Sequence, residues 1–222
     1  PVQHGMTLGE MAEMLNAEHN PTPAGLTVIR CAHWSRGMRW SATGLPFVPP
    51  SPNMPKYVTA QHYPGSCLLE GTTLSEGRGT PLPFEVVGAP YIDPWALADA
   101  VNAQSLDGVR ARPHQFTPTA SKYSGQLCSG IHLHITDADA YRPLPVWLAI
   151  LCEVRALYPD DFAWLPPYRE GGLQHFDRLI GDAQTRTVIE RGDDIAPIID
   201  GWLDVRAGFR ELSAPYRIYE DG

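Results

Sequence analysis

The stretch YPGSCLLEGTTLSEGRGTPLPFEVVGAP, residues 63–90, decides the fold, because a turn-rich loop runs directly into an apolar strand. It holds three glutamates, one arginine, five serine or threonine hydroxyls and five glycines. Glycine lets the backbone turn sharply or approach a ligand closely. We therefore expect the loop to present several ionisable groups at one place, and the PFEVVGAPYI segment to leave it as a strand.

The composition is that of a globular chain, and its charge argues against some classes of binding partner. The 222 residues are 43% hydrophobic, which is enough for one substantial core, in one domain or two small ones. A net charge of -8 argues against nucleic acid and anionic membrane surfaces as main partners. The longest apolar run, Leu144–Val154, is too short for the roughly 20 residues of a membrane span.

The periodicity of the rest of the chain predicts a mixed α/β fold. Helices are predicted at residues 7–19, 56–69, 94–104, 145–157, 183–191 and 195–209. Strands are predicted at residues 26–32, 83–92, 108–116 and 129–137, with a short closing strand at 215–219. Four widely spaced cysteines without a CxxC pair give little support to a zinc site or a thioredoxin motif, and leave disulfides open.

The glycine-rich loop carries a carboxylate pair of the kind that glycosyl hydrolysis uses. Glu70 and Glu76 could act as acid and as base or nucleophile, since such enzymes need one carboxyl of each kind. Arg78 could bind a substrate carboxylate with two parallel hydrogen bonds. An equally weighted interpretation is a surface turn in which Glu76 and Arg78 pair with solvent or with each other.

Two further motifs suggest binding groups. Ser51 and Asn53 lie in the proline-stiffened SPNMP loop, which would hold their side chains at low entropic cost. His132 and His134 alternate on a strand and so share one face. They indicate either a polar cleft face, which we favour, or a metal pair that needs further ligands. Ser75 lacks the nucleophile elbow of acyl-transfer enzymes.

Five stretches occur together in one order: HGMTLGEMA, SPNMP, YPGSCLLEGTTLSEGRGT with PFEVVGAPYID, FTPTASKYSGQLCSGIHLHITD, and LIGDAQTRTVIERGDDIAPIIDGWLDVRAGFRELSAPYRIY. In these stretches the chain resembles the NamZ exo-beta-N-acetylmuramidases. The resemblance implies a secreted or cell-envelope glycosidase that removes N-acetylmuramic acid from the non-reducing ends of peptidoglycan strands. It implies no metal and no organic cofactor, and peptidoglycan-derived saccharides as partners.

The resemblance also implies a Rossmann-like α/β domain followed by a smaller α+β domain, with the active site in the cleft between them. Residues 1–83 are expected to end the first domain and residues 84–222 to form the second. Family members begin upstream of Pro1, and a catalytically important glutamate is expected in that upstream part. The chain by itself is then catalytically incomplete, which keeps open a carbohydrate-binding module without catalysis and, more weakly, a metal-dependent amidase or phosphatase.

Residue by residue, the resemblance makes Glu70 and Glu76 catalytic and places Arg78 on the D-lactyl carboxylate of muramic acid. The remaining predicted substrate-binding residues are Ser75, Thr72, Asn53, Ser51 and His134. Thr73 stands where the family commonly has asparagine, so any contact of that asparagine is lost here.

Overall fold

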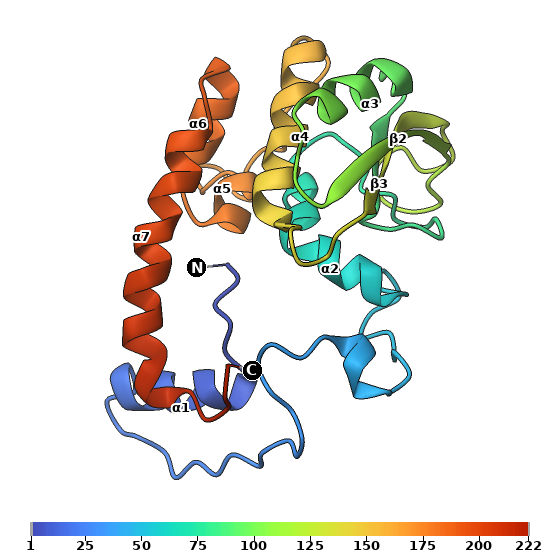
Figure 1. Cartoon of the computed structure of the whole chain (residues 1–222). Coiled ribbons are helices and arrows are strands. Elements are labelled where there is room, and N and C mark those ends of the chain that lie inside the picture. The colour runs from blue at the N-terminus through green and yellow to red at the C-terminus, as the bar shows by residue number, and fades with distance from the viewer. Residues whose placement is uncertain (1, 222) are drawn as a thin grey trace. The chain divides into compact units, whose positions relative to one another are not determined.

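The computed structural model describes residues 2–221 and confirms a mixed α/β chain (Figure 1). Its internal contacts divide it into two compact units. One unit comprises Pro1–Phe47 with Ile199–Gly222, and the other comprises Val48–Ile198.

Most of the predicted helices and the central strands are confirmed, with boundaries close to those expected. The helices are α1 (Leu8–Glu18), α2 (Tyr57–Ser66), α3 (Pro94–Ala103), α4 (Pro143–Leu157), α5 (His175–Ile180), α6 (Gln184–Arg191) and α7 (Ala196–Ser213). Short 3₁₀ turns are η1 (Trp40–Thr43), η2 (Cys67–Gly71) and η3 (Ala214–Tyr216). The strands are β1 (Val86–Ala89), β2 (Val109–Phe116) and β3 (Cys128–Ile135). No helix within residues 2–221 has the length and apolar character needed to cross a membrane.

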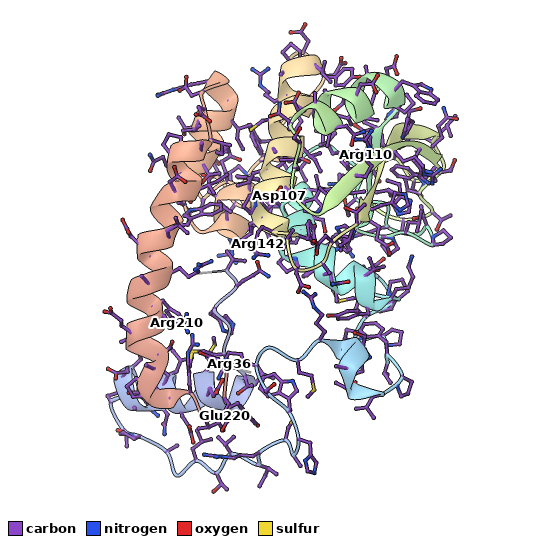
Figure 2. The ribbon with its side chains drawn as sticks, viewed as in Figure 1. Arg36, Asp107, Arg110, Arg142, Arg210 and Glu220 are labelled. Atoms are coloured by element: carbon purple, nitrogen blue, oxygen red, sulfur yellow. The ribbon has the colours of Figure 1, made fainter. Side chains whose placement is uncertain are left out.

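The first unit is held together by a buried carboxylate near the start of α1. Thr7 and Glu10 form a capping box, in which each side chain accepts a hydrogen bond from the other residue's backbone N–H. Glu10 also accepts hydrogen bonds from Arg36 and from the backbone N–H of Ile218. Figure 2 shows Arg36 next to Glu220, whose carbonyl accepts the Arg36 backbone N–H at 2.9 Å. The C-terminal tail is therefore tied to the N-terminal helix.

The second unit is built on an antiparallel sheet with the strand order β1-β3-β2. One face of the sheet is apolar, with Val87, Ala111, Ile131 and Leu133 buried. α3 contacts β2, β3 and α4 on the core side, as Figure 1 shows. Asn102 of α3 binds both the N–H and the C=O of Ala111, which satisfies an edge-strand residue from the helix.

Two predicted strands are wrong, and one helix was missed. Residues 26–32 run without a ladder and leave Ile29 85% exposed, because the described chain offers them no neighbouring strand. Residues 215–219 form part of η3 and irregular chain rather than a closing strand. The helix α5 is too short to show a clear apolar period, which is why the sequence did not reveal it.

Candidate functional site

The glycine-rich loop connects η2 to β1 and depends on its glycines at particular positions. Gly77 and Gly79 have φ angles of +74° and +77°, a conformation that favours glycine. A Cβ added at Gly71 would lie 2.7 Å from Cα of Phe176, so a side chain there would push α5 away. Glycine is therefore required at Gly77 and Gly79 for the turn of the loop, and at Gly71 for its close packing against α5.

Arg78 joins the two predicted catalytic carboxylates. Its Nε donates to Oε1 of Glu76 at 2.8 Å, and its Nη2 donates to Oε1 of Glu70 at 2.9 Å. Both glutamates therefore converge on one guanidinium. A substrate carboxylate can use this side of the Arg78 fork only by replacing Glu70 or Glu76.

Lys122 completes the cluster, a role that no sequence motif predicted. Its Nζ lies 2.9 Å from Oε2 of Glu76, which forms an ion pair. The same ammonium donates to the carbonyl oxygens of Leu69 and Thr72 at 2.8 and 3.0 Å. Burial lowers the pKa of Lys122, while the neighbouring Glu76 acts in the opposite direction. Lys122 thus links the start of the loop to the Glu76 carboxylate.

The two glutamates differ in their access to solvent. The Glu76 side chain is 2% exposed and meets a cation on each oxygen, whereas the Glu70 side chain is 26% exposed. Glu76 does pair with Arg78, as the surface-turn interpretation expected, but the pair is not a solvated one. Within residues 2–221, Arg78 is the one cation paired with Glu70, so Oε2 of Glu70 can reach a ligand.

Phe84 packs against Arg78 of the cluster and has a strained backbone conformation. The Arg78 guanidinium lies 4.9 Å from the centre of the Phe84 ring, which is a cation–π distance. Phe84 has a φ of 63° and donates its backbone N–H to the Glu76 carbonyl at 2.7 Å. Holding a non-glycine residue in this region costs about 1 kcal/mol or more. The packing of Phe84 against Tyr63, at 4.9 Å between ring centres, helps to offset that cost.

Thr72 and Ser75 lie in the loop with their hydroxyl groups engaged by backbone. Thr72 Oγ1 donates to the Leu69 carbonyl and accepts from the Leu74 N–H, at 2.9 and 3.1 Å. Ser75 Oγ accepts from the Gly77 N–H at 3.2 Å. Both residues are buried, so their clearest role is to shape the loop, and their contact with substrate stays a prediction.

Ser51 and Asn53 form a small turn of their own. Ser51 Oγ accepts the backbone N–H of Asn53 at 3.3 Å, which fixes the turn. The two residues belong to the same unit as the glycine-rich loop, and the hydrogen bond that they form is with each other. Their role in binding substrate therefore stays a prediction.

A second polar cluster occupies the sheet face opposite the apolar one. We call it the basic face; its members are Arg110, Arg112, His114, His132 and His134. Arg112 lies directly across the ladder from His132, and the rings of His132 and His134 lie 4.0 Å apart between centres. Arg112 Nε donates to Nε2 of His134 at 3.4 Å. The structure thus places His134 on a polar strand face, the interpretation that the sequence favoured.

Glu85 holds the inner edge of the basic face. It binds Nζ of Lys56 at 2.9 Å and the Thr59 hydroxyl at 2.7 Å, and Nε2 of His132 lies 3.8 Å from it. Burial alone would raise its pKa, but the neighbouring His132 and the hydrogen bonds from Thr59 and Lys56 lower the pKa of Glu85 to about 2. Among residues 2–221, no group of three or more His, Cys, Asp or Glu side chains is placed to hold a metal ion.

The glycine-rich loop and the basic face adjoin at Val86. Gly77 packs so closely on the Val86 side chain that a Cβ at Gly77 would overlap it. Val86 in turn lies directly across the ladder from His132. The loop backbone at Gly77 and His132 of the basic face are therefore both neighbours of Val86, which is itself fully buried.

The thiols of the second unit are poor nucleophiles. Burial raises the pKa values of Cys67, Cys128 and Cys152 to about 11, so all three are protonated at neutral pH. The four cysteines are free, and none is joined in a disulfide. Their chemistry agrees with the sequence argument that set acyl transfer aside.

Comparison with known proteins places this site in a family. Residues 1–58 match the family model described as exo-beta-N-acetylmuramidase NamZ, N-terminal, and residues 61–219 match the corresponding C-terminal model. The chain is 41% identical over 219 residues to the peptidoglycan beta-N-acetylmuramidase NamZ of Bacillus subtilis, covering 99% of this chain and 51% of that protein. The chain thus spans about half the length of the relative.

Two solved structures of Bacteroides fragilis proteins, both described as DUF1343 family members, share the fold. One superposes with a TM-score of 0.84 at 30% identity and covers 96% of this chain and 56% of its own. The other has a TM-score of 0.67 at 27% identity and covers 99% and 57%. On the family models and the extent of the identity, the chain belongs to the NamZ exo-beta-N-acetylmuramidase family.

Proposed function

We propose that the protein is a glycosidase that removes N-acetylmuramic acid from the non-reducing ends of peptidoglycan fragments. One observation carries the proposal beyond family membership: Glu70 and Glu76 converge on Arg78 in the glycine-rich loop. Glycoside hydrolysis needs two carboxyl groups on either side of the scissile bond, each held in its own environment. No other reaction class that the sequence suggested uses this pair.

The unequal settings of the two glutamates suggest unequal roles. Glu70 has an oxygen open to a ligand, so it is the group that would exchange a proton with the glycosidic oxygen or with water. Glu76 meets Arg78 and Lys122 on its two oxygens, so it would act as a fixed negative charge facing the oxocarbenium-like transition state. Arg78 would orient both and contact the sugar between them.

The other predicted binding residues complete the proposed site. Thr72 and Ser75 would contact the sugar through the loop they shape, while Ser51, Asn53 and His134 would line its edge. The border at Val86 supports a ligand that touches both the loop and His134. Peptidoglycan lies outside the cytoplasm, so a secreted or cell-envelope location is part of the proposal. Fractionation of cells that produce the protein tests that location.

We also propose that residues 1–83 end a Rossmann-like domain, that residues 84–222 form the smaller domain, and that the active site lies between them. The exposed Ile29 and Leu26 support this, because the VIRC segment has the composition of a buried strand and lacks a partner. A preceding half of the domain would supply that partner and the further catalytic glutamate.

A second candidate function is peptidoglycan binding without catalysis, because ion pairs with Arg78 and Lys122 already engage both oxygens of Glu76. An assay of N-acetylmuramic acid release from a muramic-acid-terminated disaccharide separates the two. The 222-residue chain should be compared with a version that carries the upstream half of its relatives. Release by the longer form supports the enzyme, whereas saccharide binding without release by either form supports the binding module.

A further inference from the structure

The basic face contains two arginines that no carboxylate neutralises. Within residues 2–221, neither Arg110 nor Arg112 forms an ion pair, and Arg112 Nε donates to the neutral acceptor Nε2 of His134. Figure 2 shows Arg110 on β2, the edge strand that carries both arginines.

The carboxylate beside this face is already occupied. Lys56 and Thr59 bind Glu85 at 2.9 and 2.7 Å, and its side chain is 4% exposed. Glu85 is thus fully used in fixing the edge of the cluster near His132. The guanidinium of Arg112 is left to meet a ligand, and it is exposed to do so.

The histidines around Arg112 supply hydrogen-bond donors as well as shape. His114 lies 5.7 Å and His134 lies 4.0 Å from His132 between ring centres, so the three rings form a continuous row. Burial and mutual repulsion lower the pKa values of His114 and His134, which leaves each ring neutral at pH 7 with one N–H to donate. A guanidinium fork with imidazole N–H groups beside it matches a planar carboxylate.

We propose that the basic face, centred on Arg112, binds the carboxylate of a sugar acid, and that this carboxylate is the lactyl group of N-acetylmuramic acid. The inference rests on the proposed function for the identity of the sugar. It gives Arg112 the task that the sequence suggested for Arg78, whose fork is engaged by Glu70 and Glu76. Gly77 of the glycine-rich loop packs on Val86, the residue paired with His132, so the loop and the basic face are neighbours in the fold.

The test is a titration of the 222-residue chain followed by the histidine Cε1–H signals in NMR spectra. N-acetylmuramic acid should shift the signals of His132 and His134, and N-acetylglucosamine, which lacks the carboxylate, should not. Arg112→Gln should weaken that binding about tenfold or more, the usual effect of losing a charge-assisted hydrogen bond. Arg112→Lys keeps the positive charge but loses the planar guanidinium. Its affinity for N-acetylmuramic acid should lie between those of the unmodified chain and Arg112→Gln.

Arg169→Gln is the control, because it removes an exposed arginine of the same unit that lies outside the basic face. It should leave the titration within about twofold of the unmodified chain. Unaltered binding by Arg112→Gln, or no shift at these histidines, would overturn the inference. Equal shifts with inorganic phosphate would show a general anion site and overturn the assignment to a sugar acid. The titration measures binding and not turnover. A failure of the proposed glycosidase activity would therefore be seen in the release assay and not in this titration.

Discussion

Lys122 and Glu76, far apart in the sequence, form a close ion pair of 2.9 Å at the base of the glycine-rich loop. The pair is mostly shielded, with 18% of the lysine side chain and 2% of the glutamate side chain exposed. Lys122 also binds two carbonyls of the loop, so it links the loop's conformation to the position of Glu76.

Lys122→Met should lower the free energy of unfolding by about 2 kcal/mol, because it leaves a buried carboxylate with one cation fewer. Chemical denaturation measures the change. Lys56→Met is the matched control: it removes a lysine that is 43% exposed from another buried glutamate, Glu85. That control should cost about 1 kcal/mol or less. Equal losses for the two variants would show that Lys122 is an ordinary surface cation.

Arg78→Ala should lower turnover of muramic-acid and glucosamine substrates alike in the longer protein, because it removes the bridge between Glu70 and Glu76. Arg112→Gln should raise the KM for muramic-acid substrates alone. Steady-state kinetics on the two substrate classes separates these outcomes. A loss confined to muramic acid in Arg78→Ala would return the lactyl carboxylate to Arg78 and contradict the assignment to Arg112.

His62 should make stability fall between neutral and mildly acidic pH. Its Nδ1 lies 2.8 Å from the Tyr141 hydroxyl, which accepts the Trp147 N–H, so the ring accepts at Nδ1 and is neutral. Burial lowers the pKa of His62 from 6.5 to about 4. The unfolded chain binds the proton first, so this stabilisation is complete above pH 6.5 and is lost as the pH falls toward 4, up to about 3 kcal/mol.

Chemical denaturation at a series of pH values between 7 and 4 measures the slope of the unfolding free energy against pH. His62→Leu should reduce this slope, whether or not the substitution also changes the total stability. His19, which is exposed on the first unit, is the matched control, and His19→Leu should leave the slope as it is. A variant at His62 with an unchanged slope would mean that the histidine is not the group that titrates.

Glu10 should make the stability of the first unit fall at a lower pH than His62 does. Burial alone would raise its pKa, but hydrogen bonds from Arg36 and from the backbone of Thr7 and Ile218 lower it to about 2. A depressed carboxyl pKa stabilises the fold above the unfolded value of about 4.5, and this contribution of about 3 kcal/mol is lost as the pH falls toward 2. Glu10→Gln should remove that dependence, as measured by acid titration of helical circular dichroism.

Local signals in the sequence predicted the elements that depend on local chemistry. The capping box of Thr7 and Glu10 is confirmed, and so is the N-cap Asp93 before the helix that starts at Pro94. The alternating strands at 108–116 and 129–137 are confirmed as β2 and β3. In each case the residues that decide the structure lie within a few positions of one another.

What the sequence missed depends on contacts between distant segments. Residues 26–32 have strand composition, but a strand needs a neighbour to bond with, and propensity alone cannot supply one. Lys122 was not predicted because two of its three acceptors are backbone carbonyls, and every residue has a backbone carbonyl whatever its type. The pairing of Arg78 with Glu76 was foreseen as one alternative; the burial of Glu76 was not.

The most direct test of the account measures release of N-acetylmuramic acid by the longer protein with single glutamate substitutions. Glu70→Gln and Glu76→Gln keep the size of each side chain, and each should reduce turnover about a hundredfold or more while saccharide binding persists. Glu211→Gln, at an exposed position on α7, is the control and should keep full activity. Full turnover in Glu70→Gln and Glu76→Gln would contradict the claim that this carboxylate pair carries out the hydrolysis.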